Sequence, residues 1–150
     1  MRQAGCPLCD GPGGVLVFQG AAFRVIRTDE GGFPAFYRVV WNGHVRELSD
    51  LAPADRARCL EAVVAVEQSL RTHLHPVKVN LAALGNMVAH LHWHVIARFD
   101  WDSHFPAPVW APARREAPLS QVARVIALRP LLEADMARQL STIRAADHAG

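Results

Sequence analysis

The sequence predicts an α+β domain in which one long helix accompanies an antiparallel sheet. Two observations favour this fold class. Short β-branched and aromatic segments lie on both sides of a single strongly helical stretch, and the last two of them are close enough to form a hairpin. The chain has 150 residues and is 51% hydrophobic, which suffices for the core of one ordinary domain. We therefore expect a single domain over residues 1–150.

Three strands are expected in the N-terminal third of the chain. Residues 15–18 and 23–27 are separated by Gln19-Gly20, and residues 35–41 form an aromatic and β-branched run that ends at Asn42-Gly43. We interpret this third run as a central strand of the sheet.

The clearest helix is expected to begin at Pro53 and to end before Pro76. Apolar residues recur there at helical spacing, and Pro53 suits the first helical turn. Two more strands are expected at residues 77–82 and 90–97, joined by a tight connection at residues 84–87.

The C-terminal part of the chain has a weaker helical signal. Several prolines follow Trp101, and an Arg- and Leu-rich stretch extends from about residue 119 to 143. We expect this stretch to be weakly helical, to break at Pro130, and to form a peripheral arm.

Composition and charge argue against several classes of protein. The formal net charge is only +2 and the cationic residues are scattered, so no duplex-DNA footprint is evident. No uninterrupted run of about 18 apolar residues occurs, and no apolar stretch precedes Cys6. Three cysteines do not make a disulfide framework. We expect a cytoplasmic protein whose partners include neither nucleic acid nor a membrane.

Three histidines alternate with apolar residues in the segment His90-Leu91-His92-Trp93-His94-Val95-Ile96. Side chains alternate between the two faces of a strand, so the histidines are expected on one face and the apolar residues between them on the core face. At roughly 3.3 Å per residue, the backbones of His90 and His94 would lie about 13 Å apart. This spacing disfavours one metal ion held by all the imidazoles.

The same spacing allows neighbouring imidazoles to act on one atom as a relay. One neutral imidazole can attack near pH 7, while its neighbours fix its tautomer and supply a proton donor or a cationic contact to phosphate oxygens. The alternative is that the histidines meet by accident on an exposed strand face. The regular apolar alternation around them favours the catalytic interpretation.

Cys6 and Cys9 form a Cys-x-x-Cys pair with zinc-knuckle spacing, whereas Cys59 lies alone in the helical segment as an expected core residue. A tetrahedral zinc site would need two further ligands from elsewhere in the chain. A redox dithiol is the alternative interpretation, although no βαβ unit follows the pair.

The histidine segment resembles the defining pattern of the histidine triad (HIT) family, His-φ-His-φ-His-φ-φ with φ apolar, at every position. The resemblance covers roughly residues 6–102, the expected core, and leaves about 103–150 as a C-terminal arm. It includes the Cys-x-x-Cys pair, His44, Asn80, Gly85-Asn86 and Arg98. Together with residues 100–106, these features are similar to a bacterial branch described as diadenosine-polyphosphate hydrolase-like.

The resemblance implies a fold, an oligomeric state and a nucleophile. The family has a five-stranded antiparallel sheet that carries the triad, and it forms a homodimer mainly through the long helix and the sheet. By residue matching, His92 would be the nucleophile, with His90 beside it in the triad. His94 would contact the α-phosphate and the leaving group.

Nucleotide-binding roles are also carried over by residue matching. Asn80 and Asn86 would donate hydrogen bonds to phosphate oxygens, and Asp29 would hold the ribose hydroxyls. Three positions depart from the family pattern: Asn86 stands where Gln is commoner, Ala97 replaces the usual Pro, and Asn80 lies one residue closer to the triad. These departures concern the phosphate contacts and the rate rather than the class of reaction.

Relatives with the same cysteine pair resemble a Cys₂His₂ arrangement. This resemblance implies that Cys6, Cys9, His44 and His90 bind one structural zinc ion. The metal would tie the N-terminus to the sheet and orient His90 next to the nucleophile.

These features predict an enzyme that acts on the α-phosphate of an adenine nucleotide conjugate, such as a dinucleoside polyphosphate or a nucleoside phosphoramidate, through a covalent nucleotidyl-histidine. One alternative is a nucleotide-binding sensor without turnover that keeps a structural zinc, but the intact His92 and His94 argue against it. Another is a zinc-stabilised structural protein with a relic triad. Metal-dependent folding without stabilisation by nucleotide would favour that last interpretation.

Overall fold

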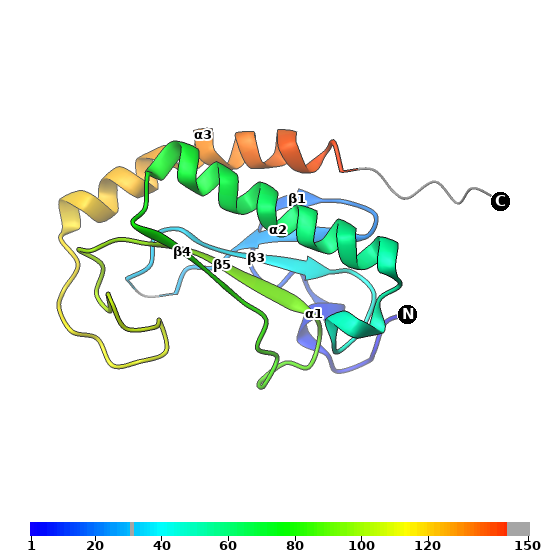
Figure 1. The fold of residues 1–150 in the computed structure, drawn as a ribbon. Coiled ribbons are helices and arrows are strands. Elements are labelled where there is room, and N and C mark those ends of the chain that lie inside the picture. The colour runs from blue at the N-terminus through cyan, green and yellow to red at the C-terminus, as the bar shows by residue number, and fades with distance from the viewer. Residues whose placement is uncertain (31, 144–150) are drawn as a thin grey trace.

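A computed structural model describes residues 1–30 and 32–143 of the chain. Five antiparallel strands form one sheet in the order β1-β2-β3-β5-β4, which confirms the predicted α+β fold class (Figure 1). Within these residues, no helix combines the length and the apolar character needed to cross a membrane. The elements are α1 (Pro7–Asp10), β1 (Val15–Gln19), β2 (Phe23–Arg27), β3 (Phe36–Trp41), the 3₁₀ helix η1 (Leu48–Asp50), α2 (Pro53–Leu74), β4 (Lys78–Ala82), β5 (His92–Arg98) and α3 (Leu119–Leu140).

β3 lies at the centre of the sheet, between β2 and β5. Arg38 of β3 is opposite His94 of β5, and Val40 is opposite His92. β4 pairs with the other side of β5, which confirms that the last two strands are antiparallel neighbours. β5 begins at His92 rather than at residue 90, so the side chain of His90 belongs to the turn before the strand.

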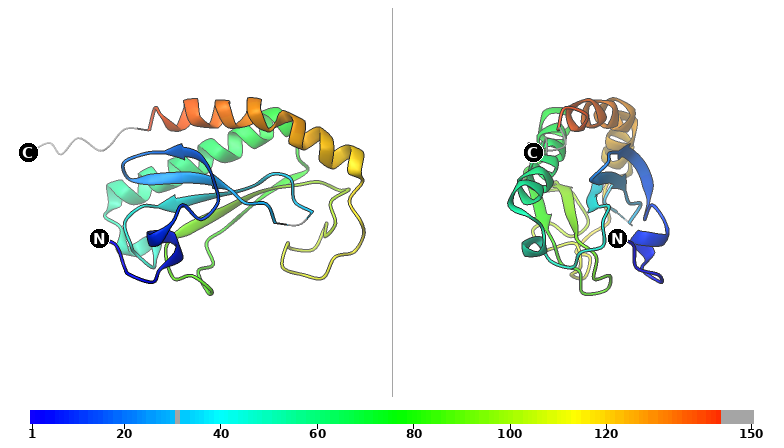
Figure 2. Two further views of the ribbon diagram at one scale, coloured as in Figure 1. Left: turned by 180° about the vertical axis from the view of Figure 1, so that it is seen from behind. Right: turned by 90° about the vertical axis from the view of Figure 1, so that its right-hand side faces the viewer.

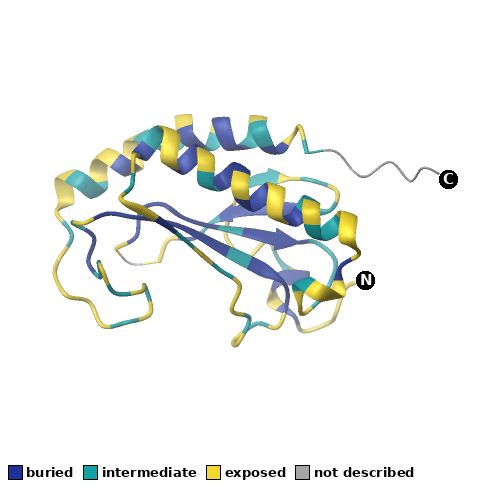
Figure 3. Cartoon of the chain, viewed as in Figure 1, coloured by how far each residue is buried: buried dark blue, intermediate teal, exposed yellow. Residues whose placement is uncertain are grey.

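α2 and α3 lie side by side over one face of the sheet (Figure 1, Figure 2). Buried residues of the sheet and of both helices form the main core between these two layers. Figure 3 shows that buried positions lie along the strands and along both helices. This core includes Val39 and Val95 of the sheet, Val66 of α2 and Leu132 of α3. The apolar residues between the triad histidines thus point into the core, as the alternation predicts.

α3 is one continuous helix through Pro130, so the expected break at this proline is wrong. Pro130 is exposed, whereas Val125, Leu132, Met136 and Leu140 are buried. Their packing outweighs the loss of one main-chain hydrogen bond, because tertiary contacts supply most of the stability of a protein helix. α3 is therefore a layer of the main core and more than a peripheral arm.

Two carboxylates of α3 make polar contacts with the rest of this layer. The Tyr37 hydroxyl donates to Glu133 Oε1 at 3.0 Å. Asp135 accepts from Ser69 Oγ at 3.1 Å and lies 3.0 Å from His73 Nε2. Burial alone would raise the pKa of Asp135, but hydrogen bonds from neighbouring side chains, first that of His73, hold this pKa below its ordinary value. These contacts fix α3 against both the sheet and α2.

The opposite face of the sheet carries two smaller apolar clusters. The N-terminal segment lies on this side, away from α2 and α3 (Figure 2). Arg38 lies on β3 between Phe36, which belongs to one cluster, and Val40, which belongs to the other. The first cluster consists of Phe33, Phe36 and Ile96; the second consists of Cys6, Leu8, Cys9, Ile26 and Val40.

A buried ion pair attaches the segment after β5 to the strand. Arg98 Nε and Nη2 donate to the Asp102 carboxylate at 2.8 and 3.1 Å. Asp102 also accepts from the backbone N–H groups of His104 and Phe105. Burial would raise the pKa of Asp102, but the Arg98 hydrogen bond, followed by those from the backbone N–H groups of Phe99 and His104, lowers this pKa below its ordinary value. The segment that is held in this way continues to Trp110.

Candidate active site and metal centre

A cavity of about 470 Å³ opens on the face of the sheet opposite the two long helices. β5 contributes His92 and His94 to it, and β3 contributes Arg38. The connection between β4 and β5 supplies much of the remaining wall, and Trp110 comes from the segment after β5. Two imidazoles and a guanidinium therefore share one hollow with a mainly apolar rim. The connection residues are Leu84, Gly85, Asn86, Met87 and Val88.

The orientation of His92 follows from a single backbone contact. Its Nδ1 lies 2.6 Å from the carbonyl oxygen of His90. A carbonyl only accepts, so Nδ1 carries the hydrogen and Nε2 of the neutral ring keeps its lone pair. Burial lowers the pKa of His92, the hydrogen bond to His90 raises it, and the charge of Arg38 lowers it further, with a net fall below the ordinary value. The ring is therefore neutral near pH 7 with Nε2 available.

His94 has the opposite tautomer. Its ring centroid lies 5.0 Å from that of His92, and the two planes meet at 78°. Arg38 Nε donates to His94 Nδ1 at 3.3 Å, so Nδ1 is the acceptor and Nε2 carries the hydrogen. Burial, and then the charges of Arg38 and His92, lower the pKa of His94 to about 4. At pH 7 His94 is a neutral hydrogen-bond donor rather than a cation.

Arg38 is the cavity residue that the sequence interpretation did not single out. Its side chain is 21% exposed, and its Nη2 donates to Glu30 Oε1 at 2.7 Å. The signal that could have identified it is its position as the one charged residue of β3, in a strand that is otherwise apolar and aromatic. Charged side chains are rare in such strands unless they have a partner or a function.

The predicted nucleotide-binding residues lie in different places. Asn86 is on the wall of the cavity. Asn80 and Asp29 are not among the residues that line it. The side-chain oxygen Oδ1 of Asn80 accepts from Arg98 Nη1 at 2.8 Å. The Asp29 side chain is 63% exposed and lies 3.6 Å from Arg27 Nε.

Two large exposed side chains stand at the cavity. Trp110 is 62% exposed and Met87 is 96% exposed, although both residues line the hollow that holds His92 and His94. Apolar side chains in such a position suit contact with a flat ligand group, because they are left in water when no ligand covers them.

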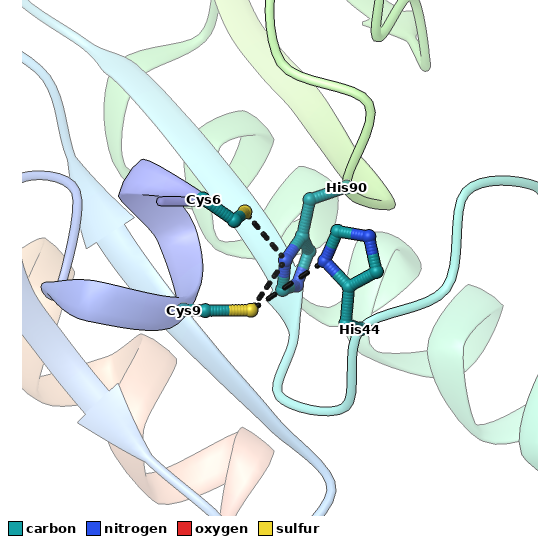
Figure 4. Close-up of side chains that lie close together, drawn as sticks. All are labelled: Cys6, Cys9, His44 and His90. Carbon is teal, nitrogen blue, oxygen red and sulfur yellow. Dashed lines mark hydrogen bonds between the residues drawn. The ribbon is translucent and has the colours of Figure 1, made fainter. Parts of the chain in front are cut away.

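The four predicted metal ligands come together in one cluster, formed by Cys6, Cys9, His44 and His90 (Figure 4). Their ligand atoms all lie within 4.8 Å of one another. Cys6 Sγ lies 3.4 Å from His90 Nδ1, and Cys9 Sγ lies 3.5 Å from the Nδ1 atoms of both histidines. Residues from α1, from the loop after β3 and from the turn before β5 thus converge.

The donor chemistry of this cluster fits a structural zinc ion. The Nε2 of His90 lies 2.6 Å from the carbonyl oxygen of Trp41, so Nε2 carries the hydrogen and the Nδ1 lone pair faces the sulfurs. Zn–S bonds of about 2.3 Å and Zn–N bonds of about 2.0 Å in a tetrahedron separate sulfur from nitrogen by about 3.5 Å. The observed S···N distances of 3.4 to 3.5 Å match this separation. Two thiols and two imidazoles are a common ligand set for closed zinc sites.

His90 connects the metal centre with the cavity. Its side chain belongs to the cysteine cluster, while its carbonyl oxygen holds His92 Nδ1. A shift of His90 therefore changes the orientation of the neighbouring imidazole. Of the triad histidines, His90 thus belongs to the cysteine cluster, whereas His92 and His94 line the cavity.

Comparisons with known proteins agree with this arrangement. The sequence profile of the HIT domain matches residues 14–101, which is more than half of the chain. No protein of curated function matches the chain significantly.

Solved structures of histidine triad proteins have a similar fold. One from Bradyrhizobium japonicum is 24% identical with a TM-score of 0.66, over 84% of this chain and 90% of that one. Another from Marinobacter aquaeolei VT8 is 31% identical with a TM-score of 0.62, over 79% and 88%. A zinc-bound protein from Mycobacterium smegmatis is 20% identical with a TM-score of 0.59, over 91% and 96%.

Proposed function

The chain belongs to the histidine triad family, and from this premise we propose that it is a nucleotide hydrolase or transferase that acts on the α-phosphate of adenine nucleotide conjugates. Membership in this family indicates nucleotide binding and hydrolase-type chemistry. The substrates we propose are dinucleoside polyphosphates or nucleoside phosphoramidates. The Cys-x-x-Cys pair and residues 100–106 support a place in the diadenosine-polyphosphate hydrolase-like branch.

The observation that carries this proposal is the orientation of His92. Its Nδ1–H is held by the His90 carbonyl at 2.6 Å, and it lies in a cavity beside His94 and Arg38. A buried neutral imidazole with a fixed ring and a free Nε2 lone pair is suited to nucleophilic attack. A residue that only binds phosphate would need no such control of its tautomer.

In the first step with a phosphoanhydride, the Nε2 lone pair of His92 attacks the α-phosphorus and a P–N bond forms. The bond between phosphorus and the bridging oxygen breaks, and that oxygen leaves with the electron pair. The Nε2–H of His94 stabilises the departing oxygen by a hydrogen bond. The covalent product is a nucleotidyl-histidine.

In the second step, a water oxygen attacks the phosphorus of this intermediate. The P–N bond breaks, its electron pair returns to His92 Nε2, and the water loses one proton to solvent. A nucleoside monophosphate is released. Another hydroxyl acceptor in place of water gives group transfer instead of hydrolysis.

Three polar residues complete the proposed nucleotide site. Asn86 donates from its amide nitrogen to an oxygen of the phosphate chain. We give Asn80 the same role; Arg98 donates to its side-chain Oδ1, an orientation in which the amide nitrogen Nδ2 serves as the donor to a ligand. Asp29 follows β2 and holds the ribose hydroxyls.

The proposed state of the protein is a cytoplasmic homodimer of single-domain subunits with one structural zinc each. Cys6, Cys9, His44 and His90 hold the zinc, which fixes the N-terminal segment and His90 and supplies no catalytic water. The exposed apolar side chains of Leu60 on α2, 40% accessible, and Leu81 on β4, 42% accessible, support pairing through these two elements.

The test follows diadenosine tetraphosphate with the wild-type protein, His92→Ala and the control His104→Gln. We expect the wild type and the control to release mononucleotide, and an acid-quenched adduct of the wild type to map to His92 by mass spectrometry. His92→Ala should lose the adduct and roughly 1,000-fold or more of the rate.

A wild type that binds nucleotide but is inert and unlabelled on both polyphosphate and phosphoramidate would contradict the enzyme proposal. That result would favour the sensor without turnover.

A further inference from the structure

The guanidinium of Arg38 faces the cavity at the level of His94. The two residues are cross-strand partners, so their side chains leave the same face of the sheet. Among the cavity residues that the structure describes, Arg38 is the only one that is permanently charged. Its neighbours on the same face of β3, Phe36 and Val40, belong to the two apolar clusters and carry no charge.

Only some of the Arg38 donors are used within the described chain. Nε donates to His94 and Nη2 donates to Glu30 at 2.7 Å, whereas Nη1 has no partner among residues 1–30 and 32–143. A guanidinium has five N–H donors in a planar fork that matches two phosphate oxygens. As far as residues 1–30 and 32–143 are concerned, the remaining donors are available to a ligand.

The positive charge in the cavity comes from Arg38 and not from the histidines. His94 is neutral at pH 7 because burial and the neighbouring charge of Arg38 lower its pKa to about 4. From the sequence we expected a neighbouring histidine to supply a cationic contact to phosphate oxygens. We now assign this contact to Arg38. His94 keeps the role of a neutral donor through Nε2.

We propose that Arg38 binds the phosphate group next to the α-phosphate, on the leaving side, and so makes this protein selective for phosphoanhydrides over phosphoramidates. This inference rests on the proposed function, because it assigns a substrate class to the same site. It follows from the contact between Arg38 and His94, whose Nε2–H serves the leaving group. An anionic leaving phosphate beside His94 meets the free Nη1, while an uncharged amine does not need it.

The experiment compares two substrates that share the adenylate and differ in the leaving group: diadenosine tetraphosphate and adenosine 5′-phosphoramidate. The variant is Arg38→Gln, which keeps an N–H donor for His94 but removes the charge. The control is Arg124→Gln, the same change at an exposed position of α3.

We expect Arg38→Gln to lower kcat/KM for diadenosine tetraphosphate roughly 10- to 100-fold, because it removes one charge-assisted hydrogen bond to the substrate. The phosphoramidate value should change less than roughly 3-fold, and Arg124→Gln should change neither. Arg38→Lys, which keeps the charge without the fork, should restore part of the loss. An equal loss on both substrates, or no loss on either, would overturn the proposal.

A binding measurement separates this inference from the proposed function. In the His92→Ala background, which cannot turn over through the nucleophile, the affinities for ADP and AMP are compared by calorimetry. We expect ADP to bind roughly 10-fold or more tightly than AMP, and Arg38→Gln to abolish the difference. If the ratio is unchanged by Arg38→Gln, the inference is wrong, whether or not the wild type is an enzyme.

Discussion

The triad histidines differ in which ring nitrogen carries the hydrogen, and the neighbouring atom decides this in each case. The Trp41 carbonyl takes the Nε2–H of His90, and the His90 carbonyl takes the Nδ1–H of His92. An N–H of Arg38 occupies Nδ1 of His94. The same side chain thereby becomes a metal ligand, a candidate nucleophile and a neutral donor within five consecutive residues.

His94 should make the folded protein less stable in mild acid. Burial, followed by the charges of Arg38 and His92, lowers its pKa to about 4, while the unfolded chain has the ordinary value of about 6.5. Between these pH values the unfolded chain binds a proton that the folded chain does not. Stability is therefore lost as the pH falls from 6.5 toward 4, by about 2 kcal/mol at pH 4.5.

Urea unfolding of the wild type and His94→Gln at pH 7 and pH 4.5 checks this prediction. The free energy of unfolding of the variant should fall about 2 kcal/mol less than that of the wild type. Asp102 and Asp135 also have lowered pKa values, so their protonation in acid also destabilises the folded protein. Both residues are present in the wild type and in the variant, so their contribution cancels in the comparison. An equal fall in the two proteins would contradict the assignment.

At this scale the sequence could predict positions but not contacts. The alternation of His90, His92 and His94 with apolar residues placed the triad correctly relative to the core. The tautomers depend on carbonyls and on Arg38, whose approach is set by the pairing of β3 with β5. No local pattern reports such a cross-strand contact.

Among the elements, α3 is where sequence interpretation and structure differ most. Pro130 predicted a break, because a proline removes one hydrogen bond and crowds the preceding turn. The burial of Leu132 and Met136 against α2 and the sheet keeps the helix continuous instead. Helical propensity is local, whereas this stabilisation depends on where the helix packs.

The role of α3 can be tested with adjacent leucines. Leu132 is fully buried, while Leu131 is 60% exposed. Leu132→Ala should lower the free energy of unfolding by roughly 2 to 5 kcal/mol through lost burial and a cavity, and Leu131→Ala should change it by less than about 0.5 kcal/mol. Chemical denaturation of both variants measures the difference. A similarly small effect in both variants would contradict the conclusion that α3 is part of the main core.

For the molecule as a whole, the metal centre should contribute to stability. Purified protein is expected to hold about one zinc per chain by elemental analysis. Binding of zinc at roughly 1,000 times its Kd stabilises the folded state by about 4 kcal/mol, so a chelator should lower Tm by roughly 10 °C. Cys9→Ser should lose the metal, whereas His104→Gln should retain it.

Full activity and an unchanged Tm in zinc-free protein would contradict this role of the cluster. The proposed role of the zinc predicts a fall of kcat with little change of KM, because His90 contacts His92 Nδ1 through its carbonyl oxygen and has no proposed contact with substrate.

The parts of the architecture that show a periodic sequence pattern could be predicted, whereas the contacts between segments that are distant in the chain could not. The strands, α2 and the relation of β4 to β5 follow from alternation and helical spacing. The Cys6 and Cys9 pair was predicted from its spacing, whereas His44 and His90 were identified as its co-ligands only through a family resemblance, since no spacing rule connects Cys6 with His90. The cavity itself depends on how the connection between β4 and β5 and the segment that carries Trp110 fold over the sheet, and no local pattern reports this.

The metal cluster also sets an order of events during synthesis. Cys6 and its partner His90 are 84 residues apart in the chain. A ribosome that adds about 5 to 20 residues per second needs roughly 4 to 17 s to pass from one to the other. During that interval the thiols of Cys6 and Cys9 lack their His90 ligand, so they can react with oxidants or bind competing ions until residue 90 has been translated.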